Sequence, residues 1–190
     1  MQIVTENIIG KRIMDRRLEK TLIDRCPILF RDMYKSPQNT CMAFGIETGN
    51  GWFKLVYELS EKLESIISKM PLPGYREKDE IKETPFGTFT LPAGPMEDER
   101  PAASQVKEKF GRLSFYMTCA TPEMYELIRE AEKKSLTICE YCGKKGRLRR
   151  NSWWRTLCWW HNFTDKWGAG RGWLGYHIWN IKRIIKKFWQ

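Results

Sequence analysis

Four residues with metal-binding side chains stand in two pairs near the end of the chain: Cys139 with Cys142, and Cys158 with His161. Their spacing is C-x2-C, fifteen residues, then C-x2-H. Two thiolates at this spacing can hold one ion from a tight turn, and Gly143 follows where the turn needs positive φ. A thiolate-rich set of four ligands suits tetrahedral zinc, with no coordination position left for a substrate. The pattern therefore predicts a structural zinc site rather than four unrelated residues.

The positive charge of the chain is concentrated in the same region. The 190 residues include 33 Lys and Arg and 23 Asp and Glu, for a net charge of +10. Residues 139–190 hold twelve of these basic residues and two of the acids, together with eight of the nine tryptophans. This asymmetry indicates a polyanionic partner. The candidate binding residues near the predicted zinc site are Lys144, Lys145, Arg147, Arg149, Arg150 and Arg155.

Residues 173–189 predict a basic amphipathic helix. At about 100° per residue, apolar side chains fall on one arc and most cations on the opposite arc. The candidate binding residues on the cationic arc are Trp179, Lys182, Arg183, Lys186 and Lys187. The alternative is that the apolar side packs on the core of the chain while the cations are only solvated. His177 lies on the apolar arc, and we expect a partly buried polar tip rather than a ligand.

The elements that must position these residues are predicted from hydrophobic periodicity and turn signals. They are a charged helix over 5–24 capped by Thr5, a strand over 41–47, a helix over 52–70, a Pro-rich connection over 71–103 with a short hairpin at 86–89, a helical turn over 105–110, a strand over 113–118, and a helix starting at Thr121. The predicted buried stripe of the 52–70 helix is Trp52, Val56, Leu59, Leu63, Ile66, Ile67 and Met70.

The predicted fold class is α+β, with a small antiparallel sheet, packed helices, a zinc knuckle near the C-terminus and a basic amphipathic C-terminal helix. We expect three regions: an α+β core over 1–138, the knuckle over 139–161, and a basic Trp-rich extension over 162–190. The three other cysteines, Cys26, Cys41 and Cys119, are expected to be small buried hydrophobic residues.

The C-x2-C-G knuckle, a short hairpin and the C-x2-H helix start together resemble a treble-clef zinc finger. Residues 157–162 are also similar to the closing half of the zinc-bearing HNH nucleases. Those nucleases place a metal-binding, general-base His between the two halves, whereas residues 143–157 contain no His. Hydrolysis needs a base near its nucleophile and usually a metal with an open position. We therefore predict that the protein is not an enzyme.

The wider chain resembles a family of small bacteriophage proteins, which implies a phage origin and the zinc site but no particular activity. The matching segments are residues 26–30, 51–53, 105–111, 115–116 and 139–161.

The leading functional hypothesis is a non-enzymatic phage protein that binds DNA or RNA through its basic, Trp-rich C-terminal region. The alternative is an inhibitor of a host defence complex, anti-CRISPR-like or another anti-defence protein, that acts by protein contact on a host nucleic-acid-binding protein. An anionic membrane surface is a third possible partner. No signal peptide and no run of about 18 apolar residues occurs, so we expect the cytoplasm of an infected bacterial host.

Overall fold

The computed structural model describes residues 14–33, 35–85, 87–96, 98–150 and 153–168. Its elements in chain order are α1 (Arg16–Arg25), the 3-10 helices Cys41–Phe44 and Asn50–Trp52, α2 (Phe53–Ile67), β1 (Tyr75–Arg76), β2 (Glu80–Thr84), β3 (Gly87–Leu91), β4 (Gly94–Pro95), β5 (Ala103–Lys109), β6 (Arg112–Met117), α3 (Pro122–Ser135), β7 (Arg147–Arg150), β8 (Trp154–Leu157) and α4 (Trp159–Gly168). Helices and antiparallel strands occur together, which confirms the α+β class. The described strands form four separate two-stranded pairs instead of one sheet.

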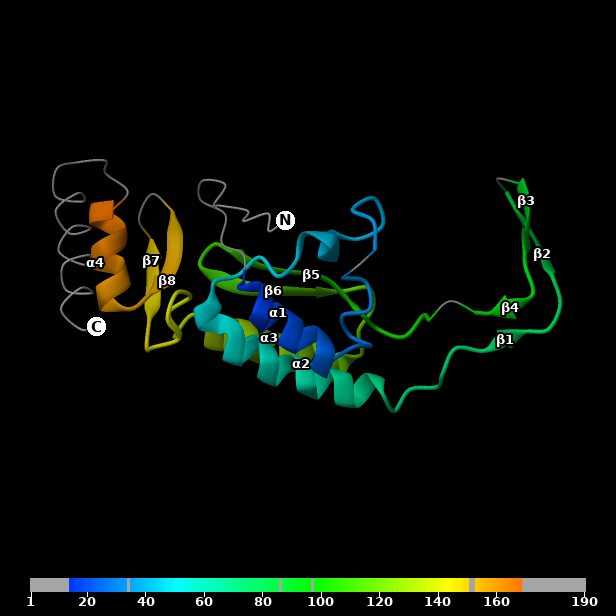
Figure 1. The fold of residues 1–190 in the computed structure, drawn as a ribbon, viewed down its shortest axis with the longest axis horizontal. Helices are drawn as coiled ribbons and strands as arrows, with labels where there is room; N and C mark the ends of the chain where they lie inside the picture. Colours follow the sequence, from blue (N-terminus) through cyan, green and yellow to red (C-terminus); the bar gives the residue numbers. More distant parts are fainter. Residues whose placement is uncertain (1–13, 34, 86, 97, 151–152, 169–190) are drawn as a thin grey trace, which may run out of the picture.

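Helices α1, α2 and α3 and the β5–β6 hairpin form the body of the molecule (Figure 1). Helix α3 packs on β6, α2 packs on α3, and α1 packs on α2. Most of the predicted stripe of α2 is buried, and Ile66 and Met70 are half-buried at its edge. The buried residues of these elements include Leu22 from α1, Val56, Leu59, Leu63 and Ile67 from α2, Val106, Leu113 and Phe115 from the hairpin, and Met124, Ile128 and Ala131 from α3.

Capping side chains set the starts of two helices. Helix α1 begins after Asp15, whose carboxylate accepts a hydrogen bond from the backbone N–H of Arg17. Helix α3 begins after Thr121, whose side chain accepts from the N–H of Met124, as predicted. The predicted cap at Thr5 lies outside the described residues. Met14 and Asp15 are described and are not helical, so the prediction of one helix over 5–24 is wrong at these two residues.

The helical turn predicted over 105–110 is wrong, because residues 105–109 belong to β5 and Phe110 lies in the turn that follows it. Val106 is fully buried and pairs in register with Phe115 of β6. Pairing across the hairpin outweighs the helical preference of the Lys-Glu-Lys sequence. Phe110 and Gly111 form the tight turn between the strands, with φ values of 53° and 75°. Positive φ at both positions matches the twist of a two-residue hairpin.

The strand predicted over 41–47 is also wrong. Residues Cys41–Phe44 form a 3-10 helix, capped by the side chain of Thr40 and ended by Gly45 at φ 80°. The cap and the positive φ interrupt an extended chain at both ends of the segment. Only Glu47 makes an isolated parallel bridge, to Lys107 of β5.

The Pro-rich segment contains more strand structure than predicted. Residues 72–96 form an arm in which β1 pairs with β4 and β2 pairs with β3, so the expected short hairpin extends from Glu80 to Leu91. Figure 1 shows this arm projecting from the body. At its base, the Arg31 guanidinium donates hydrogen bonds to the backbone carbonyls of Asp98, Arg100 and Pro101.

The cysteines outside the predicted zinc site differ in burial. Cys26 is buried as predicted, and burial together with the nearby Glu64 raises its thiol pKa to about 12. Cys41 and Cys119 are exposed, contrary to the prediction.

Among the described residues, no helix combines the length and apolar character that crossing a membrane requires.

Candidate metal centre

The first pair of ligands lies on a tight turn that follows α3. The N–H of Gly143 donates to the carbonyl of Cys139 at 2.9 Å, and the N–H of Cys139 donates to the carbonyl of Lys144 at 2.7 Å. Gly143 has φ 72°, the left-handed conformation predicted for this position. The turn brings the Sγ atoms of Cys139 and Cys142 into the same cluster of candidate ligand atoms. Cys139 is buried and Cys142 is exposed.

The second pair of ligands lies at the start of α4, as predicted. Cys158 immediately precedes the helix, and His161 is in its first turn. The backbone N–H of His161 points at the Cys158 Sγ atom, 3.4 Å away. The Tyr141 ring packs against the His161 imidazole with 5.0 Å between ring centroids, so the imidazole is covered on one side.

The four ligand atoms lie within 4.8 Å of one another. Cys142 Sγ is 3.9 Å from Cys158 Sγ, and His161 Nδ1 is 3.4 Å from Cys139 Sγ and 3.3 Å from Cys158 Sγ. Tetrahedral zinc, with bonds of about 2.3 Å to sulfur and about 2.0 Å to nitrogen, spaces two sulfurs by about 3.8 Å and sulfur from nitrogen by about 3.5 Å. These three separations are close to those values, and all the cysteines are free thiols, so this cluster could hold a metal ion.

The pKa values of the Cys139 and Cys158 thiols are shifted in opposite directions. Burial raises the pKa of Cys139 to about 11. Burial also acts to raise the pKa of Cys158, but the N–H of His161 and the neighbouring thiols outweigh it, so the Cys158 pKa is lowered. A buried thiol with a raised pKa stays protonated in the absence of an ion. Binding a metal ion would therefore displace a proton from Cys139.

The knuckle is attached to the body by backbone contacts with the segment before α2. The N–H of Gly51 donates to the carbonyl of Glu140 at 2.8 Å, and the N–H of Gly49 donates to the Glu140 carboxylate at 3.1 Å. A Cβ atom on Gly51 would lie 2.5 Å from Gly143 N and 2.6 Å from Cys142 N. Only glycine at position 51 allows the two backbones to approach so closely.

The Trp52 indole makes the next contact between the body and the metal centre. Its Nε1–H donates to the carbonyl of Ile138 at 2.8 Å, one residue before the first ligand. The sequence predicted a core position for Trp52, but not that Gly49, Gly51 and Trp52 contact the candidate metal centre. The two glycines flanking Asn50 are the only signal in the sequence of this close approach.

The basic candidate residues near the knuckle lie on and beside the β7–β8 hairpin. Arg149 is directly opposite Arg155, and Arg150 is opposite Trp154. One face of the hairpin packs on the turn of the β5–β6 hairpin, where the Thr156 hydroxyl donates to the carbonyl of Gly111 at 2.6 Å. The structure thus brings all six residues to the metal end of the molecule: Lys144, Lys145, Arg147, Arg149, Arg150 and Arg155.

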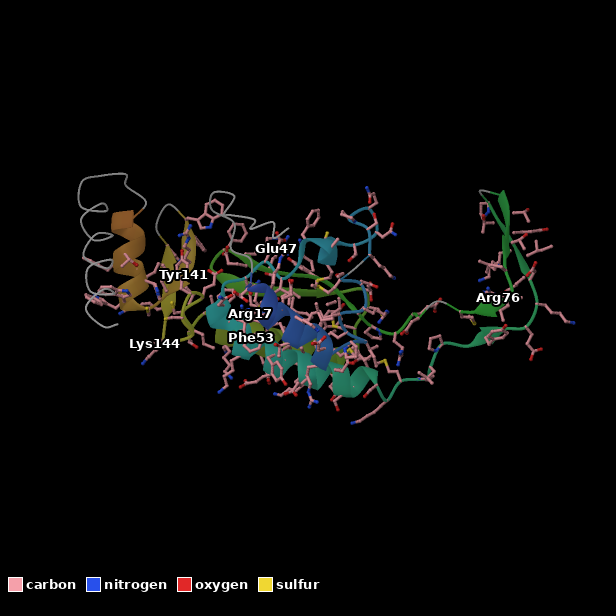
Figure 2. All side chains as sticks on the ribbon, viewed as in Figure 1. Arg17, Glu47, Phe53, Arg76, Tyr141 and Lys144 are labelled. Atoms are coloured by element: carbon pink, nitrogen blue, oxygen red, sulfur yellow. The ribbon has the colours of Figure 1, made fainter. Side chains whose placement is uncertain are left out.

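Four of these six cations are exposed, namely Lys144, Lys145, Arg147 and Arg150, whereas Arg149 and Arg155 are half-buried. Figure 2 shows Lys144 and Tyr141 at the end of the molecule opposite Arg76 of the arm. The remaining candidates lie outside the described residues: Trp179, Lys182, Arg183, Lys186 and Lys187.

Comparison of the chain with protein-family models, with curated proteins and with solved structures gave no match.

Proposed function

We propose that this protein is a non-enzymatic, phage-encoded zinc protein that binds nucleic acid through its basic, Trp-rich C-terminal region. The observation that supports this most directly is the gathering of six cations around the metal centre, at one end of the molecule.

Zinc is the proposed ion because three thiolates and one imidazole are the ligands it prefers in closed, structural sites. All four coordination positions are taken by the protein. The ion would supply folding energy to residues 139–161, and the surface cations would be held in place by that fold.

The zinc proposal is tested by Cys139→Ser, with Cys41→Ser as the matched control because Cys41 is exposed and lies outside the metal centre. We expect Cys139→Ser to lose bound zinc in elemental analysis and to lower Tm, because the structural ion supplies folding energy. The control should retain both properties. Equal zinc content and Tm in the two variants would exclude a structural zinc ion.

Nucleic acid is the proposed partner because spaced cations neutralise phosphates and release counterions. The only acid among residues 139–164 is Glu140, which is fully buried, so no carboxylate of this segment offsets its six cations at the surface.

The nucleic-acid proposal is tested by titrating the zinc-loaded full chain into labelled DNA and RNA at several salt concentrations. The variant is Arg147→Ala with Arg150→Ala, and its control is Lys62→Ala with Lys69→Ala, an equal charge loss on exposed residues in and just after α2. We expect the first variant to reduce the slope of log Kd against log salt concentration by about two, because it loses about two phosphate contacts. No binding of the wild-type protein to DNA or RNA at low salt would refute the proposal.

A second candidate function is inhibition of a host defence complex through protein contact. Exposed tryptophans beside arginines favour it, since these residue types anchor protein interfaces. A pull-down from bacterial lysate with added nuclease separates the two functions. A host protein that is retained after nuclease treatment favours this candidate.

A further inference from the structure

Two clusters of side chains that contain exposed aromatic rings lie on or beside the β7–β8 hairpin. The first, the α4 cluster, consists of Trp159, Trp160 and Phe163. The Trp159 and Phe163 rings are stacked with 5.9 Å between centroids and 13° between planes. Trp160 packs against both rings, at 6.4 Å and 6.5 Å. Trp159 nevertheless remains 71% exposed.

The second group, the hairpin cluster, consists of Phe110, Trp154 and Arg150. The Phe110 and Trp154 rings meet edge to face, with 6.3 Å between centroids. The Arg150 guanidinium lies over the Trp154 ring, 5.0 Å from its centroid. Phe110 is 69% exposed and is the only non-glycine residue with positive φ in the described part of the chain. The hairpin turn accounts for this backbone conformation, but it does not account for the exposure of the ring.

Neither cluster is explained by the core or by the metal centre. The core is formed by other residues, and the four metal ligands are cysteines and a histidine. Removing a large aromatic side chain from water lowers the free energy, so the exposed rings of Trp159, Phe110 and Trp154 within one small region indicate a surface that a partner covers.

The surrounding charge identifies the kind of partner. Exposed Lys144, Lys145, Arg147 and Arg150 lie in the same region as the two clusters. A partner that fits flat, exposed rings among cations has flat rings of its own and a negative charge at regular intervals. Single-stranded nucleic acid has both properties, because its unpaired bases stack on aromatic rings while its phosphates contact Lys and Arg.

We infer that the zinc-bound end of the protein binds single-stranded nucleic acid, with bases stacked on the α4 cluster and on the hairpin cluster. This inference rests on the proposed function and makes it more specific. A duplex presents phosphates to the same cations, but its bases are already stacked on one another. The aromatic clusters therefore favour the single strand over a duplex of the same sequence.

The experiment compares three labelled ligands at one salt concentration: a single strand, the blunt duplex of that strand, and an abasic strand with the same phosphates and no bases. The zinc-loaded full chain is used throughout, and Kd is measured by fluorescence anisotropy. We expect the single strand to bind at least about tenfold more tightly than the abasic strand, because only the single strand has bases that can stack on the aromatic rings.

The variants are Trp159→Ala and the conservative Trp159→Phe, with zinc content and Tm measured for both. We expect Trp159→Ala to weaken single-strand binding about tenfold and to leave the salt dependence and the abasic affinity unchanged. Trp159→Phe should retain most of the affinity, because a phenyl ring still stacks. If Trp159→Ala does not fold, the abasic comparison with the wild-type protein decides.

Equal affinity for the single strand, the duplex and the abasic strand would overturn the inference and leave the proposed function standing. A folded Trp159→Ala protein that binds the single strand as the wild type does would overturn it as well. No binding to any of the three ligands would refute both the inference and the proposed function.

Discussion

Gly51 lies where the knuckle and the start of α2 meet backbone to backbone. Its missing side chain leaves room for the N–H groups of Cys142 and Gly143, and its own N–H holds the carbonyl of Glu140. The packing of the candidate metal centre against the body therefore depends on a residue outside the set of four candidate ligands.

We expect Gly51→Ala to lower the free energy of unfolding by about 3 kcal/mol, because its Cβ would overlap backbone atoms that cannot rotate away. The control is Gly74→Ala, whose Cβ would meet only the flexible Met96 side chain, at 3.1 Å from its sulfur. Urea unfolding of both variants checks this. Similar destabilisation in the two proteins would contradict it.

Asp98, at the base of the arm, gives the stability a pH dependence. Its carboxylate pairs with the Arg100 guanidinium at 2.7 Å, and this hydrogen bond lowers the Asp98 pKa to about 2. The unfolded pKa is about 3.9, so the pair stabilises the folded protein above about pH 4. That contribution is lost as the pH falls from about 4 to about 2, because the carboxylate becomes protonated.

We expect Asp98→Asn to be less stable than the wild type at neutral pH and to approach it in acid, below about pH 3. Urea midpoints of both proteins across this pH range provide the test, and loss of metal in acid affects both proteins alike. A stability difference that stays constant down to pH 2 would contradict the role of the carboxylate.

At the scale of elements, local patterns predicted what local interactions determine. The stripe of α2 and the Thr121 cap of α3 lie within single helices, and both are confirmed. The paired metal ligands also sit on short segments, so their spacing predicted a cluster that the structure brings together. By contrast, β5 is a strand because Val106 pairs with Phe115 across the hairpin, which no local preference reveals.

The support of the metal centre could not be predicted for the same reason. Gly49 and Glu140 are 91 positions apart in the chain, and nothing in either segment identifies the other. The sequence located the tryptophans in the basic region, but only the structure shows that Trp159 stacks with Phe163 at the surface.

Metal removal should act unequally on the elements. We expect a chelator at neutral pH to expose the backbone amides of Gly143 and Asn162, whose hydrogen bonds lie in the knuckle and in α4. The amides of α2 and α3 should stay protected, since those helices pack in the core. Hydrogen exchange with and without chelator measures this. Uniform loss of protection would show instead that the body cannot fold without the ion.

At the scale of the whole molecule, the arm and the metal centre lie at opposite ends of the body (Figure 1). The hydrogen bonds of β1–β4 join residues of the arm to one another. For example, the N–H of Met96 donates to the carbonyl of Gly74 at 2.9 Å. Leu72, Tyr75 and Ile81 are exposed and add nothing to the core. A two-stranded arm of this kind contributes little to the stability of the body.

We expect that replacing residues 75–95 by Gly-Gly leaves Tm and metal content unchanged, because Gly74 and Met96 are already hydrogen-bonded neighbours. Calorimetry and elemental analysis of the shortened protein check this. A large drop in Tm would show that the arm packs on the body in solution. Arg31→Ala in the shortened protein tests whether any change in Tm comes from the hydrogen bonds of Arg31 at the base of the arm rather than from the arm itself.

The contact between Gly49 and Glu140 also has a consequence for kinetics. It closes a very long segment of chain, and contacts of high sequence separation form late and slow the folding reaction. An ion that binds only after this contact has formed stabilises the native state without stabilising the transition state for folding. We therefore expect bound metal to prolong the lifetime of the native molecule, by slowing its unfolding, while the speed of folding stays nearly the same.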